Sequence, residues 1–257
     1  MQDPPRDFPW WLLAVAVLLG GAYVAILVDD GARQVLLTLR KGIWITVFVT
    51  LVAFVAASLL GLGLALMSLS AWVAVRQTAR FYVEIVRGIP ILVLLLYVAF
   101  VFAPGLVAFW NWLGLPEIRT RDFTLLWRAI LALVIAYSAF IAEVFRAGLQ
   151  SVDPGQIEAA KALGLHRFHR FRHIILPQAT RTILPPLGND FVAMVKDSSL
   201  VSVVGVLDIA QLGKLTAAGN FRYFETYNVV ALLYLTMTIL ASLGLRRLER
   251  YMARKQG

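Results

Sequence analysis

Four consecutive polar residues interrupt an apolar stretch in the last third of the chain: Lys196, Asp197, Ser198 and Ser199. The flanking residues 191–195 (FVAMV) and 200–204 (LVSVV) are typical of a membrane span. A charged side chain at bilayer depth costs about 2.5–3.5 kcal/mol, so it persists where it pairs or faces water. A cation, a carboxylate and two hydroxyls could bind a solute that carries both charges. The alternative is an internal Lys196–Asp197 ion pair that only stabilises its segment.

Helix-disrupting residues bracket this polar run. Pro185 and Pro186 precede it and Gly205 follows it, so we expect the helix to be interrupted on both sides. Broken helices near the bilayer midplane are a common place for substrate binding in transporters. The binding site and the structural ion pair both stay open at this point.

Two further pairs of opposite charges are spaced three residues apart, Glu84 with Arg87 and Glu143 with Arg146. This spacing allows a local ion pair on one face of a helix. Both pairs fall near the ends of expected spans, so they could instead line a polar path through the membrane. Asn189 and Asp190, a turn beyond the prolines, are weaker candidates for the same path.

The chain lacks the usual catalytic and cofactor-binding groups. It has no cysteine, which excludes thiolate catalysis and a cysteine-based metal site. All its histidines lie in one polar stretch, which excludes a Ser-His-Asp site inside the membrane, and we expect a basic, partner-facing surface of His166, His169 and His173. Residues 213–215 (GKL) lack the other residues of a phosphate-binding loop. We therefore expect a protein that is not an enzyme and binds no metal or cofactor itself.

The composition is that of an integral membrane protein. Hydrophobic residues make up 60% of the 257 residues and charged residues only 15%, against roughly 25% charged in soluble domains. The 24 Lys and Arg against 15 Asp and Glu give a net charge of +9. In a membrane protein such an excess indicates basic cytoplasmic loops, so we expect no nucleic-acid partner.

Apolar runs predict an all-α polytopic membrane protein, because about 20 residues of helix cross the hydrocarbon core. Six spans are expected at residues 10–28, 43–69, 89–110, 125–142, 182–206 and 229–245. The basic tail that follows the last span should be cytoplasmic, and an even number of spans places both termini there. The polar segment 146–181 and a short turn with Arg76 and Arg80 then lie on the same side.

The polar segment contains a well-marked short helix. Asp153 is a suitable N-cap and the proline after it suits the first helical position. Residues 158–163 favour helix, and Gly164 can adopt the left-handed conformation that ends one. A second short helix is expected from about 166 to 175, closed by Pro177.

The same segment matches the pattern E-A-A-x3-G-x9-I-x-L-P at every fixed position: Glu158, Ala159, Ala160, Gly164, Ile174, Leu176 and Pro177. Four more motifs accompany it, at residues 86–90 (VRGIP), 142–148 (AEVFRAG), 184–189 (LPPLGN) and 196–200 (KDSSL). Together they resemble the membrane subunits of bacterial ATP-binding-cassette (ABC) importers for polar amino acids, the histidine, glutamine and glutamate branch. The resemblance covers roughly residues 42–250.

The resemblance implies a type I importer permease core of five helices, with the first span as an extra N-terminal helix. Residues 1–41 would be that helix and a periplasmic linker, and residues 42–250 the permease domain with a coupling loop at about 151–177. Residues 251–257 would form a basic cytoplasmic tail. The chain would lie in the bacterial inner membrane.

The resemblance also implies partners. Two ABC ATPase subunits, which use ATP and Mg, would bind the loop: Glu158 by an ion pair, Ala159 and Ala160 by close approach, Gly164 through its turn, with Pro177 behind. A second permease subunit, identical or related, and a solute-binding protein would complete the importer in the lipid bilayer. Lys196, Asp197, Ser198 and Ser199 would then meet a zwitterionic amino acid. The rival class is an ion-coupled secondary transporter or channel using Lys196 and Asp197, which usually shows a repeat that we do not find.

Overall fold

The computed structural model describes residues 10–254, and every regular element in that range is helical. In chain order the elements are α1 Trp10–Val28, α2 Asp30–Ser68, α3 Val73–Gly88, α4 Ile91–Tyr97, the π-turn η1 Val98–Phe102, α5 Ala103–Trp112, α6 Leu125–Gln150, α7 Pro154–Ala162, α8 Arg167–Arg170, the π-turn η2 Phe171–Ile175, α9 Leu176–Asp197, the 3-10 helix η3 Ser198–Val204, α10 Ile209–Asn220 and α11 Tyr223–Arg254. The all-α prediction is confirmed.

Five helical segments of the described chain are long and apolar enough to cross a membrane: Trp10–Val28, Asp30–Ser68, Ile91–Trp112, Leu125–Gln150 and Tyr223–Met252. The remaining expected span, 182–206, falls on α9 and η3. With 22 residues α9 is long enough, but it has no apolar stretch like those of the five, because Arg181, Asp190, Lys196 and Asp197 are spread along it. The structure thus supports five of the six expected spans on composition.

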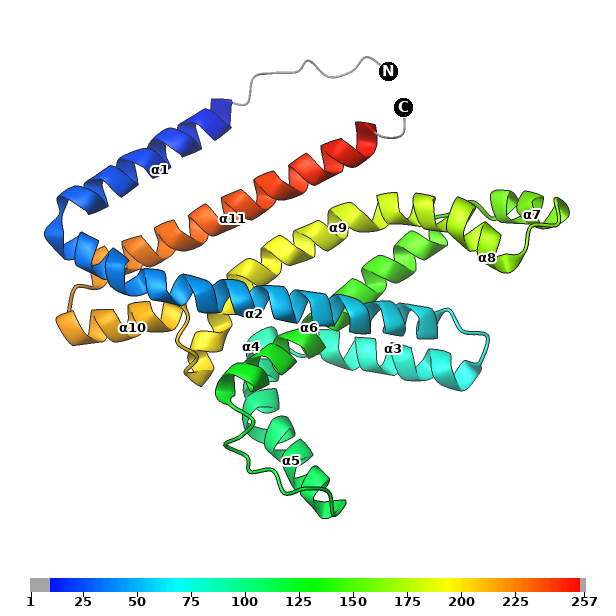
Figure 1. Cartoon of the computed structure of the whole chain (residues 1–257), viewed down its shortest axis with the longest axis horizontal. Helices are drawn as coiled ribbons and strands as arrows, with labels where there is room; N and C mark the ends of the chain where they lie inside the picture. Colours follow the sequence, from blue (N-terminus) through cyan, green and yellow to red (C-terminus); the bar gives the residue numbers. More distant parts are fainter. Residues whose placement is uncertain (1–9, 255–257) are drawn as a thin grey trace.

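The centre of the bundle is the packing of α2 against α6 (Figure 1). Small residues let the two backbones approach, as is usual between membrane helices. A side chain on Gly61 of α2 would lie 2.9 Å from Ile141 Cγ2 and 3.0 Å from the Ser138 carbonyl oxygen of α6. Around this contact the buried core includes Val49, Ala53, Leu133 and Ala136.

Helix α1 lies at the edge of the molecule, beside α11 (Figure 1). Ile26 is its only buried residue, and the Tyr23 hydroxyl is 3.0 Å from Thr236 Oγ1 of α11. The linker expected up to residue 41 is not an extended segment, because α2 begins at Asp30. Asp29 caps α2 by accepting a hydrogen bond from Ala32 N at 3.0 Å, which starts the helix early.

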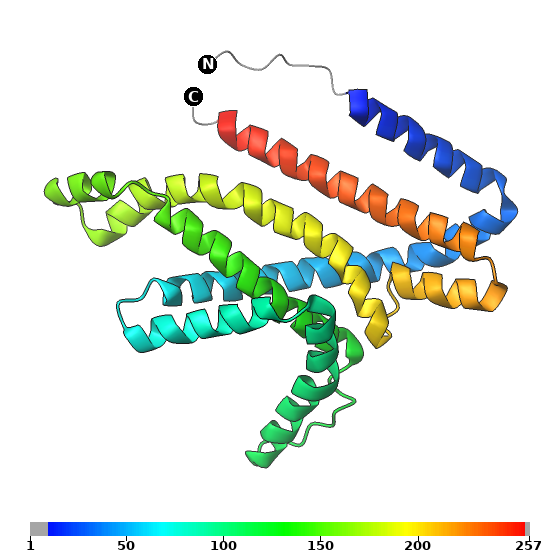
Figure 2. The ribbon, with the colours of Figure 1, turned by 180° about the vertical axis from the view of Figure 1, so that it is seen from behind.

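The elements have a clear polarity, which both views show. The α2–α3 connection and α7 lie at one end of the bundle, and the α1–α2 and α10–α11 connections lie at the other (Figures 1 and 2). The short turn expected around Arg76 and Arg80 is instead part of α3, a 16-residue helix that packs Ala79, Val83 and Val86 into the core. That apolar face stabilises a helix where the basic residues alone suggested a loop.

The prolines do not interrupt the chain as expected. Pro177 lies in the first turn of α9 instead of closing a short helix, and the π-turn η2 before it widens the helix where a proline ring would meet the preceding turn. α9 also continues through Pro185 and Pro186. Packing against α6 and α11 holds it helical there, as neighbouring helices do for prolines in membrane proteins. Gly205, at φ 90°, ends η3 as predicted.

Candidate functional site

Helix α7 projects from the bundle at the end where the α2–α3 connection lies (Figure 1). Its start is held by the Asp153 side chain, which accepts a hydrogen bond from Gly155 N at 2.8 Å. Its end is a Schellman motif: Leu165 N donates to the Ala160 carbonyl at 3.0 Å and Gly164 N to the Lys161 carbonyl at 2.9 Å. Gly164 has φ 72°, so the predicted left-handed helix end is confirmed.

The two faces of α7 differ. Glu158 and Ala159 are exposed, and the side chain of Leu163, just after the helix, is 81% exposed. Ala160 is only 2% exposed and faces the body of the protein. On the inner side, Gln178 of α9 donates a hydrogen bond from Nε2 to Gln156 Oε1 at 2.6 Å, and Pro177 lies next to this contact in sequence. α7 is therefore a supported helix that presents a small acidic and apolar surface outward.

The side chains of Lys196 and Asp197 have different surroundings. Asp197 Oδ2 accepts a hydrogen bond from the Tyr137 hydroxyl of α6 at 2.8 Å. Lys196 is exposed and lines a groove between α9, α11 and α1. The two form no ion pair in residues 10–254, so the alternative of an internal Lys196–Asp197 pair is not seen there. Ser198 is buried, with its hydroxyl donating to the Val195 carbonyl at 2.8 Å, and Ser199 is half-buried.

A second carboxylate lies on α9 near Asp197. Asp190 precedes it by seven residues, which is two helical turns and places both on one face. Its Oδ2 is buried with no hydrogen-bond partner among the described residues. An unpaired buried acceptor is costly, so the arrangement favours a donor from a ligand or a partner. Asn189 beside it is exposed.

Glu84 and Glu143, far apart in sequence, line one cleft between α2, α3 and α6. The cleft has a volume of about 250 Å³ and also holds Arg80 and Arg146. Glu143 Oε2 pairs with Arg146 Nη2 at 2.5 Å, as the spacing predicted. Glu84 forms no ion pair with Arg87 within the described range; instead the Arg87 guanidinium lies 5.6 Å from the centre of the Phe140 ring.

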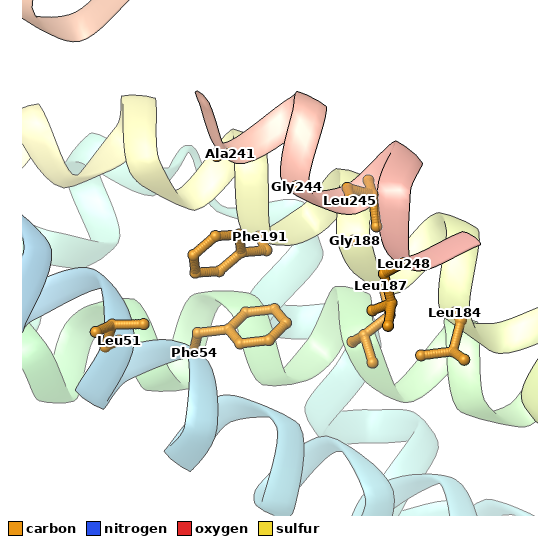
Figure 3. Close-up of a pocket in the computed structure, with 10 residues that line it drawn as sticks. All are labelled: Leu51, Phe54, Leu184, Leu187, Gly188, Phe191, Ala241, Gly244, Leu245 and Leu248. Atoms are coloured by element: carbon orange, nitrogen blue, oxygen red, sulfur yellow. The ribbon is translucent and has the colours of Figure 1, made fainter. Parts of the chain in front are cut away.

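A larger cavity between α2, α9 and α11, about 460 Å³, is apolar (Figure 3). The rings of Phe54 of α2 and Phe191 of α9 meet edge to face, with their centroids 5.0 Å apart. The side chain of Leu245 of α11 packs over Gly188. None of the lining side chains carries a charge or a hydroxyl. A charged solute would lose its hydration there without replacement, so this cavity does not suit one.

Sequence reasoning missed two residues that the structure marks. Tyr137 is 60 residues from its partner Asp197, and no local pattern connects them. Asp208 is fully buried and accepts hydrogen bonds from Gln211 N and the Tyr234 hydroxyl, both at 2.8 Å. It caps α10 and ties it to α11. An Asp directly before a helical apolar segment is a usable N-cap signal.

These observations describe a helical membrane protein that presents a supported helix on its outside and places acidic groups between its helices. Residues 57–256 match the family described as "Binding-protein-dependent transport system inner membrane component". The chain is 36% identical to the probable amino-acid permease protein YxeN of Bacillus subtilis, over 84% of this chain and 92% of that one. It is 35% identical to the glutamine transport system permease protein GlnP of Escherichia coli, over 83% and 92%.

Solved structures agree. A crystal structure of an amino acid ABC transporter with histidines superposes with a TM-score of 0.70 at 36% identity, covering 83% of this chain and 94% of that one. An inward-facing MetNI methionine ABC transporter, at 21% identity, shares the fold with a TM-score of 0.65. The chain belongs to the family of inner-membrane components of binding-protein-dependent transport systems. It is a permease subunit with the type I importer fold and is not itself an ATPase, so the resemblance is confirmed and the secondary-transporter alternative is wrong.

Proposed function

We propose that this permease subunit moves a polar amino acid into the cytoplasm by alternating access driven by ATP. The observation that carries this proposal is α7: the E-A-A-x3-G pattern forms a helix that is anchored from behind and exposed in front. The relatives named for glutamine and amino-acid transport support the substrate class.

The proposed assembly contains two ATPase subunits, which hold ATP and Mg, a second permease subunit and a solute-binding protein. We propose six spans, with α9 and η3 as the fifth in order, and both termini in the cytoplasm. The described ends support this: α1 begins on the side where α11 ends, and α11 closes with Arg246, Arg247 and Arg250 (Figure 1). Residues 251–257 would continue that basic end.

We propose that Glu158, Ala159 and Leu163 enter a groove on the ATPase. Glu158 would pair with a cation there, and the short side chain of Ala159 would allow close approach. Ala160 faces inward, so its role would be to seat α7 on the permease, with Pro177 in the supporting turn. Gly164 would set the direction in which the chain leaves the helix.

We propose that the substrate path passes the acidic face of α9. Asp190 and Asp197 would accept hydrogen bonds from the substrate's ammonium group, with Tyr137 orienting Asp197 and Ser198 and Ser199 close by. The path would continue to the cleft with Glu84 and Glu143, with Arg87 and Asn189 at its margins. That Lys196 meets the substrate's carboxylate stays a prediction, and the groove that it lines offers it another ligand.

Co-purification tests the proposal directly. The permease, expressed with the ATPase and solute-binding subunits of its own transport system, should retain the ATPase and show hydrolysis stimulated by the loaded binding protein. A permease that purifies without any ATPase and still transports would contradict it.

A further inference from the structure

A groove of about 250 Å³ runs between α1, α9 and α11. Its walls combine apolar and cationic side chains: Trp11, Leu12, Val192, Lys196, Ile239 and Arg246, with Thr238, Ser242 and Leu243 completing the lining on α11. It differs from the apolar cavity of Figure 3, which shares none of these residues. Because α1 supplies one wall and lies outside the matched residues 57–256, the groove depends on the N-terminal helix of this chain.

Among residues 10–254, no acidic side chain pairs with the two cations of the groove. Neither Lys196 nor Arg246 forms an ion pair in residues 10–254, and the Arg246 guanidinium instead lies 4.9 Å from the centre of the Trp11 ring. The hydroxyls of Thr238 and Ser242 already donate to backbone carbonyls of α11, at 2.9 and 2.8 Å. The donors left for a ligand are therefore the two cations and the indole N–H of Trp11, and because two of the three are cationic the ligand should be an anion.

The position of Arg246 on α11 gives the depth of the groove. Residues 226–245 of α11 contain no charged side chain, and 20 helical residues span about 30 Å, the thickness of the hydrocarbon core. Arg246 follows directly and so lies at one membrane interface, where a tryptophan such as Trp11 is also favoured. From there the groove leads inward along Leu12, Ile239 and Leu243.

We propose that this groove binds an anionic phospholipid of the cytoplasmic leaflet. Arg246 would contact the phosphate, Lys196 would extend toward it from the deeper end, and an acyl chain would cover the apolar wall. A free phosphate would satisfy the cations but would leave that wall uncovered. The choice of leaflet rests on the topology under Proposed function; the contact with an anionic lipid does not.

Because this chain has no cysteine, an introduced cysteine is the single thiol of this subunit and can report lipid contact. Ser242→Cys in the groove, labelled with bimane in the complete transporter, is reconstituted in phosphatidylcholine vesicles that contain a small share of brominated lipid. Brominated phosphatidylglycerol should quench the label more strongly than the same share of brominated phosphatidylcholine. Arg246→Gln should reduce this preference about fivefold, which is the contribution of roughly one basic residue near an anionic surface.

Arg247→Gln is the matched control, since Arg247 is the next residue on α11, is exposed, and does not line the groove. It should leave the preference unchanged. Equal quenching by both lipids, or equal effects of the two arginine variants, would overturn the proposal. Absence of quenching by either lipid would show that protein covers the groove, and a bimane response to inorganic phosphate without phosphatidylglycerol would indicate a soluble anion; both also overturn it. The readout does not depend on transport, so it fails independently of the proposed function.

Discussion

The segment around α7 and the segment from Asp197 to Asp208 satisfy their polar groups in different ways. Around α7 the partners are near in sequence: Asp153 caps Gly155, and Gly164 and Leu165 close the helix on Lys161 and Ala160. In the second segment, partners distant in sequence take part: Tyr137 of α6 donates to Asp197, and Tyr234 of α11 donates to Asp208, which also caps its own helix through Gln211 N. The ends of α7 are therefore set by its own residues, whereas the geometry of the acidic groups depends on the packed bundle.

The largest effect should come from the outer face of α7. Because Glu158 is exposed and makes no contact that folding needs, Glu158→Lys should leave complex yield unchanged but reduce substrate-stimulated ATP hydrolysis and uptake to background. Hydrolysis and uptake in proteoliposomes measure this. Glu117→Lys, an equal charge change at an exposed site between α5 and α6, is the control and should behave as wild type. Wild-type uptake in Glu158→Lys would remove α7 as the coupling element.

The next effect should come from the acidic face of α9. Asp197→Asn removes the carboxylate charge that, in our proposal, binds the substrate's ammonium group. A charge-assisted hydrogen bond is worth about 1.5–3 kcal/mol, so uptake efficiency should fall roughly ten- to a hundredfold. Complex yield is measured in parallel. A loss of yield in proportion to the loss of uptake would make Asp197 a structural residue.

Lys196→Met tests whether Asp197 depends on the distant Tyr137 or on the neighbouring lysine. If Lys196 neutralised Asp197, the single variant would leave a lone charge and misassemble. In the structure Asp197 is bound by Tyr137, and Lys196 lies in the groove between α1, α9 and α11. We therefore expect Lys196→Met to assemble normally, and the added change Asp197→Leu should not increase complex yield. Yields of the single and double variants check this; misassembly repaired by the second change would show a pair that the isolated chain lacks.

Local signals made α7 predictable, and tertiary contacts explain most of what the sequence did not show. A capping side chain and a glycine that adopts positive φ are both local signals. Asp153 and Gly164 therefore predicted the two ends of α7, and Gly205 predicted the end of η3. Pro185 and Pro186 misled because packing against α6 and α11 outweighs their preference. The cleft that joins Glu84 to Glu143 needs the α3–α6 contact, which no spacing along the chain encodes.

Gly164→Ala tests the residue that ends α7, with a smaller expected effect. A methyl group at Gly164 meets no atom within 4 Å, so only the positive φ opposes it, at about 1–2 kcal/mol. Stimulated hydrolysis should fall several-fold at unchanged yield. Gly63→Ala also adds a methyl group in open space, at a glycine with ordinary φ, and should have no effect. Equal behaviour of the two variants would mean that the left-handed turn does not orient the coupling surface.

The smallest effect should come from Tyr137→Phe, which keeps the ring and removes only the hydroxyl that binds Asp197. One hydrogen bond contributes about 1 kcal/mol, so the substrate concentration for half-maximal uptake should rise about fivefold while the maximal rate changes little. A purely structural bond would instead lower complex yield and leave that concentration unchanged. Tyr82→Phe is a matched control, because its hydroxyl bonds Ser138 on the same helix α6, away from Asp197. If both variants shift the half-maximal concentration equally, Tyr137 acts through general packing of α6, and the acidic face of α9 loses its orienting residue.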